Sequence, residues 1–129
     1  MSEIRANTIS DAAGTGPITL TGQSAAKAWI NIPDGQASIN QSFNVSSLED
    51  DGTGDGKVNF VSSMADANYA FTASNHDRNA SSTVYHVDIS LGNPPTVSRY
   101  AFESVSHNTT TNRSNVDMDN YHVIHGDLA

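Results

Sequence analysis

The sequence contains no cysteine. Disulfide bonds and thiolate metal sites are therefore excluded, and stability must come from packing within the chain or between chains. Basic residues are scarce, with 6 Lys and Arg against 14 Asp and Glu and a formal net charge of -8. Because such a field repels phosphate backbones and no basic stripe interrupts it, we expect no nucleic-acid partner.

Long apolar runs are missing too. No run approaches the roughly 18 apolar residues that a membrane span needs. Residues 1–5 (MSEIR) also lack the basic start and the apolar stretch of a secretory signal. We therefore expect a protein that is made in the cytoplasm, does not insert into a membrane, and reaches the outside only within a larger particle.

Large side chains are few, since hydrophobic residues make up 36% of the chain and aromatic residues 7%. The core must then be thin, which favours two β layers over a thick α/β domain. Short alternating segments separated by polar turns recur from Ala28 onward, and no apolar stripe of helical period and length is present. We predict an all-β fold, an antiparallel β-sandwich that is jelly-roll-like.

Several segments carry more detailed expectations. Segment 83–91 is the clearest strand, and its apolar face carries Tyr85, Val87, Ile89 and Leu91. Phe43 and Val45 are expected on one face of a strand, segment 64–67 in a helical turn at most, and segment 49–56 in a tight connection. Segment 106–115 reads as an exposed loop, and the last strand as 116–125.

The chain divides into two parts. Residues 1–27 contain few side chains large enough to build a core, so this segment cannot offset the entropy of ordering it alone. We interpret it as an extended anchor or neck, and residues 28–129 as the β-sandwich knob.

Several motifs resemble the tail-fibre and virion fibre (receptor-binding) proteins of bacteriophages. Residues 2–9 (SEIRANTI) and 14–17 (GTGP) resemble the opening of such proteins. Residues 25–31 (AAKAWIN), 42–47 (SFNVSS) and 51–60 (DGTGDGKVNF) resemble the start of their terminal domain. The likeness covers about the first half of the chain. It implies a homotrimeric knob that joins other virion proteins through its N-terminal segment and adsorbs to a glycan or protein of the bacterial surface.

Two other functions stay open at this point. The same features suit a capsid decoration or head-fibre protein without a receptor role, because both kinds of subunit need an anchoring N-terminus and a displayed β domain. A carbohydrate-binding module unrelated to phages is the third and weaker alternative.

Two polar loops are the candidate receptor-binding elements, because loops on a rigid scaffold carry binding in such folds. Both are rich in Asn, Ser and Thr, which pair with sugar hydroxyls, although either loop taken alone is equally well explained as solvated surface. The candidate contact residues are Asn75, His76, Asp77, Arg78, Asn79, Asn108, Thr109 and Asn112.

Trp29 is the only tryptophan, and it lies where the sparse segment meets the knob. It is either an ordinary core residue of the first strand or, with Ile30, a contact between subunits, where aromatic residues are favoured.

Metal and catalytic chemistry is not expected. His122 and His125 have a spacing that places them on opposite faces of a strand, and His86 lies on the polar face of its strand. The acidic run 50–55 is read as a hairpin connection, with calcium binding as the alternative. Because no nucleophile motif or carboxylate pair stands out, we expect no cofactor and no enzymatic activity.

Overall fold

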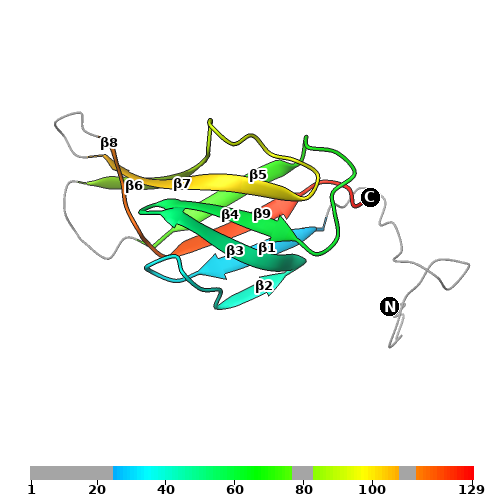
Figure 1. Ribbon diagram of the computed structural model, residues 1–129, viewed down its shortest axis with the longest axis horizontal. Helices are drawn as coiled ribbons and strands as arrows, with labels where there is room; N and C mark the ends of the chain where they lie inside the picture. The colour runs from blue at the N-terminus through cyan, green and yellow to red at the C-terminus, as the bar shows by residue number, and fades with distance from the viewer. Residues whose placement is uncertain (1–24, 77–82, 108–112) are drawn as a thin grey trace, which may run out of the picture.

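The computed structural model describes residues 25–76, 83–107 and 113–129. All regular structure in these residues is β, arranged as two antiparallel sheets that pack face to face (Figure 1). This confirms the predicted all-β sandwich. Within the described residues, no helix is long and apolar enough to cross a membrane.

Each sheet interleaves early and late strands. The four-stranded sheet has the order β2-β1-β9-β5, from Gln41–Phe43, Ala28–Ile32, Asn120–His125 and Ala70–Asn75. The five-stranded sheet has the order β3-β4-β7-β6, from Val45–Gly52, Asp55–Phe60, Arg99–His107 and Val84–Ile89. The short strand β8, Arg113–Asn115, pairs with β7.

The core lies between the two sheets and follows the strand alternation. Phe71 and Tyr100, from opposite sheets, place their ring centroids 5.3 Å apart, and Tyr100 also contacts Phe60 at 5.9 Å. Burial of each large apolar side chain contributes about 1.5–3 kcal/mol. The buried apolar set is Ala28, Ile30, Ile32, Val58, Phe60, Met64, Tyr100, Phe102 and Ile124.

Asn44 turns the chain from one sheet to the other, so the prediction that Phe43 and Val45 share one face is wrong. Phe43 ends β2 on the exposed surface, whereas Val45 begins β3 in the other sheet and packs against the core. Asn44 has a φ of 55°, a left-handed conformation that asparagine tolerates better than most residues. Its side-chain amide donates to the carbonyls of Lys27 and Ser62, which fixes the corner.

The acidic run 49–56 forms more strand than the sequence suggested. Strands β3 and β4 extend into it and leave a tight turn at Thr53 and Gly54. A Cβ on Gly54 would lie 2.5 Å from the Ser104 carbonyl oxygen, and its φ of 72° favours glycine as well. Opposite charges across the hairpin favour this strand pairing, since Lys57 Nζ lies 2.5 Å from Asp51 Oδ2.

Four further boundaries differ from the prediction. Strand β6 ends at Ile89, and Leu91 lies in the following turn at 99% exposure instead of on the apolar face. Segment 64–67 is not helical, because the Met64 amide donates to the Val97 carbonyl and Met64 is buried. In segment 106–115, β7 continues to His107 and β8 starts at Arg113. The last strand begins at Asn120 instead of 116.

The two ends of the sandwich differ in what they carry. At one end β1 begins at Ala28, opposite Ile124 of β9, and β5 begins at Ala70, opposite His125. We call this the proximal end, because the chain preceding β1 joins the domain there. At the other end β5 stops at Asn75, and β6 starts at Val84, which pairs with His107. We call this the loop end (Figure 1).

Candidate functional site

Both predicted receptor-binding loops connect to the loop end of the sandwich. One follows Asn75 and leads to β6, and the other follows His107 and leads to β8. The structure therefore brings together the strand ends that flank the two loops. Six of the predicted contact residues lie outside the described residues: Asp77, Arg78, Asn79, Asn108, Thr109 and Asn112.

Asn75 and His76 are described, and both are held by the segment before β9. The Asn75 amide donates to the sulfur of Met118 at 3.1 Å and is partly buried. The His76 backbone amide donates to the Asp119 carbonyl, and its imidazole Nδ1 lies 3.7 Å from Asp119 Oδ2. Of the two side chains, only that of His76 is largely exposed. Asn75 is therefore mainly a structural residue, while His76 is available to a ligand.

The outer face of the four-stranded sheet carries three exposed aromatic residues. Trp29 is paired with Phe43 on one side and with Val123 on the other, so these three side chains form one row. The next row contains Asn31 paired with Tyr121. Phe43 is 52% exposed, Tyr121 41% and Trp29 37%. Large apolar groups gathered on a surface mark interaction sites more often than single ones do.

The four strands of this sheet also lack acidic and basic residues. None of its four strands contains Asp, Glu, Lys or Arg. Its other outward side chains include amides and hydroxyls, and strand β5 aligns Thr72 with Val123 and Ser74 with Tyr121. We call this surface the aromatic face and define it by Phe43, Trp29, Val123, Thr72, Gln41, Asn31, Tyr121 and Ser74.

The sequence alone allowed Trp29 to be either a core residue or a contact between subunits, and it predicted that Ile30 would share the subunit contact. Trp29 lies on the aromatic face, so it is not an ordinary core residue. Ile30 points the other way and is 2% exposed within the core, so it cannot contact another subunit directly. The period of two along a strand explains why adjacent residues have opposite positions.

The outer face of the five-stranded sheet is highly charged by contrast. Lys57 lies between Glu49 and Asp51, and the Arg113 guanidinium is paired with Glu103. His86 Nε2 is 3.0 Å from Asp88 Oδ2, and its ring stacks on His107 with centroids 4.9 Å apart. His86 thus lies on the polar face of its strand, as predicted. The protein therefore has two chemically different outer faces.

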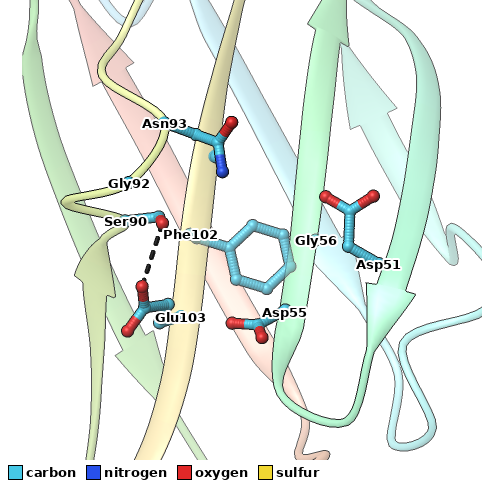
Figure 2. Close-up of a pocket in the computed structure, with 9 residues that line it drawn as sticks. Asp51, Asp55, Gly56, Ser90, Gly92, Asn93, Phe102 and Glu103 are labelled. Atoms are coloured by element: carbon cyan, nitrogen blue, oxygen red, sulfur yellow. Dashed lines mark hydrogen bonds between the residues drawn. The ribbon is translucent and has the colours of Figure 1, made fainter.

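A depression of about 290 Å³ lies on the charged side, between β4, β7 and the turn after β6 (Figure 2). Asp51 and Asp55 line it from the β3–β4 hairpin, and Glu103 from β7, next to Ser90 and Asn93. Gly56 forms part of its wall, and the Phe102 ring lies so close that a Cβ on Gly56 would be 2.8 Å from it.

The two facing carboxyl groups of this depression have different pKa values. Partial burial raises the pKa of the Asp55 carboxyl, and the charge of Glu103 raises it further. Hydrogen bonds from Arg113 and then from Ser90 lower the pKa of Glu103. Glu103 is therefore the more strongly stabilised anion of the pair.

The carboxylates of the depression are already occupied by protein partners. Glu103 accepts from Ser90 Oγ at one oxygen, at 2.9 Å, and from Arg113 at the other. Asp55 accepts from the Asn115 amide at 3.0 Å, and Asp51 is paired with the Lys57 ammonium. Among the described residues, no group of three or more His, Asp or Glu is arranged to hold a metal ion. Segment 50–55 forms the hairpin between β3 and β4, as predicted.

A polar cluster inside the core escaped the sequence reasoning. His122 is buried, with its Nδ1 2.9 Å from the Tyr100 hydroxyl, while His125 lies on the opposite side of β9, as predicted. Burial lowers the pKa of His122 to about 3, so the ring is neutral. Ser104 Oγ accepts from the buried amides of Gln36 and Asn120 at 2.9 and 2.8 Å. No local pattern indicates this cluster, because its members come from distant segments.

Comparison with known proteins identifies no relative. No family model matches the chain, and no match was found among the curated proteins or the solved structures.

Proposed function

We propose that the chain is a virion subunit of a bacteriophage, a fibre or receptor-binding protein that is displayed on the particle for attachment to the host surface. It acts by binding and not as an enzyme. Residues 1–27 join it to other virion proteins, and the sandwich assembles as a homotrimer. The identification with phage fibres rests on the resemblance of segments 2–9, 25–31 and 51–60.

The polarity of the sandwich is the observation that supports display best. The chain joins the domain at the proximal end, where β1 begins at Ala28, and both candidate loops leave from the loop end. Ala28 pairs with Ile124 and Asn75 with Asn120, so the length of β9 separates the two ends. A subunit anchored at its N-terminus would therefore present its loops outward, away from the particle.

The chemistry of the depression supports binding over catalysis. Glycoside hydrolysis needs one carboxylate free to attack the sugar or to activate water. Glu103 accepts hydrogen bonds from Arg113 at one oxygen and from Ser90 at the other, and these bonds lower the pKa of Glu103, which weakens it as a general acid or base. Asp55 is held by Asn115.

Two variants test attachment at the loop end. His76→Ala and Arg78→Ala together should reduce adsorption of the particle to host cells. His76→Ala alone should leave the melting temperature nearly unchanged, because the His76 side chain is exposed. Val84→Ala is the matched control, since Val84 is exposed beside the same loop but offers no polar group. Normal adsorption of the double variant would contradict the assignment of the loop and would favour a capsid decoration role.

A further inference from the structure

The aromatic face combines two kinds of group in adjacent rows. One row is apolar over three strands, with Phe43, Trp29 and Val123 side by side. The neighbouring row offers amide and hydroxyl groups, from Gln41, Asn31, Tyr121 and Ser74. Strands lie about 4.8 Å apart, and successive outward residues along a strand about 7 Å apart, so a ligand one ring wide meets both rows.

A partner for this face must be uncharged and amphipathic. The four strands offer an ionised ligand no opposite charge, because they contain no Asp, Glu, Lys or Arg. A purely apolar partner would leave the amides and hydroxyls of the second row unpaired, which costs free energy when they are buried. Interfaces between subunits have a mainly apolar centre. On this face the apolar side chains form a single row across the strands, which is narrower than such a centre.

We infer that the aromatic face binds a neutral oligosaccharide. The C–H face of a pyranose ring is apolar and packs on the exposed rings of Trp29 and Phe43, while its hydroxyls pair with Asn31, Gln41 and the Tyr121 hydroxyl. The ligand lies across the strands, from β2 to β9. This inference goes beyond the proposed function, because it adds a binding surface distinct from the two loops at the loop end, and it replaces the role of Trp29 as a subunit contact.

The single tryptophan makes the inference directly measurable. Trp29 is the only tryptophan of the chain and is part of the aromatic face. All tryptophan emission therefore reports on the surroundings of this face. The full chain is titrated with neutral hexose oligomers, namely glucans, galactans, mannans and N-acetylhexosamine oligomers, and with an oligogalacturonate as the acidic comparison. We expect a saturable change in emission with at least one neutral series, a weaker response to its monosaccharide, and none to the acidic oligomer.

Variants locate the binding. Phe43→Ala and Tyr121→Ala, followed by calorimetry and by Trp29 emission, should each weaken the affinity about tenfold, equivalent to about 1.4 kcal/mol. Val84→Ala, an exposed apolar residue of the other sheet, should leave the affinity unchanged. Circular dichroism of each variant checks that the fold is intact.

Three outcomes would overturn the inference. The first is no response to any neutral series at millimolar concentration, and the second is equal binding of the acidic oligomer. The third is self-association through this face. Trp29 emission would then shift with protein concentration in the absence of sugar, and Phe43→Ala would have a lower mass in solution than the parent protein. The titration needs no particle, so its failure leaves the proposed virion role standing. Absence of the chain from particles would refute that role and leave the titration unaffected.

Discussion

Lowering the pH should destabilise the protein through His122. Its imidazole is buried between Tyr100, Phe71 and Phe102, and burial lowers its pKa to about 3 from about 6.5 in the unfolded chain. Below pH 6.5 the unfolded chain takes up a proton that the folded chain does not, so stability falls as the pH falls toward 3. Each pH unit in that window removes about 1.4 kcal/mol, so a change from about pH 7 to pH 5 removes roughly 2 kcal/mol.

Urea unfolding at both pH values measures this effect. The loss in the parent protein should exceed the loss in His122→Gln by roughly 2 kcal/mol, because the variant has no group to titrate there. His125→Gln is the matched control on the opposite side of β9 and should lose as much as the parent. Equal losses in the parent and in His122→Gln would refute the reasoning. If that variant does not fold, an NMR titration that shows the His122 ring protonating near pH 6.5 in the folded parent refutes it as well.

Three further predictions follow from the packing and the assembly. Ser104→Ala should cost about 2–4 kcal/mol in urea unfolding because it leaves the buried amides of Gln36 and Asn120 unpaired. Ser106→Ala, at a half-buried position of the same strand, loses only one hydrogen bond to the Ser114 carbonyl and should cost about 1 kcal/mol or less. Gly54→Ala should destabilise the β3–β4 hairpin by about 2–4 kcal/mol, since the added Cβ meets backbone atoms and the φ is positive; a change below about 0.5 kcal/mol would contradict the turn geometry. Light scattering should report about three times the 13.7 kDa chain mass, and a monomer at all concentrations would contradict the trimer.

The strand pattern was predictable where the alternation was local. Alternating segments were predicted from Ala28 onward, and the first strand begins there; Val58 with Phe60, and Tyr100 with Phe102, each share the buried face. Period-two alternation carries this information without any knowledge of the partner strand. It fails where the chain changes sheet, as at Asn44, whose side-chain hydrogen bonds to Lys27 and Ser62 depend on the completed fold.

The functional surfaces were harder to predict than the strands. The aromatic face unites Phe43, Trp29 and Tyr121, which are far apart in sequence and become neighbours only through the order β2-β1-β9. In β9 the apolar Tyr121 and Val123 point outward, while the polar Asn120 and His122 are buried. This inverts the usual rule that apolar side chains face the core. Only contacts between distant segments, such as Ser104 with Asn120, explain it.

The location of the protein on a particle tests the proposed function most directly. An antibody raised against residues 25–129 is applied to intact purified virions and imaged by electron microscopy. We predict label at the outer end of a fibre or tail structure, and loss of both label and chain from particles that carry a deletion of residues 1–24. Virions in which neither label nor peptides of this chain are found would contradict the central claim.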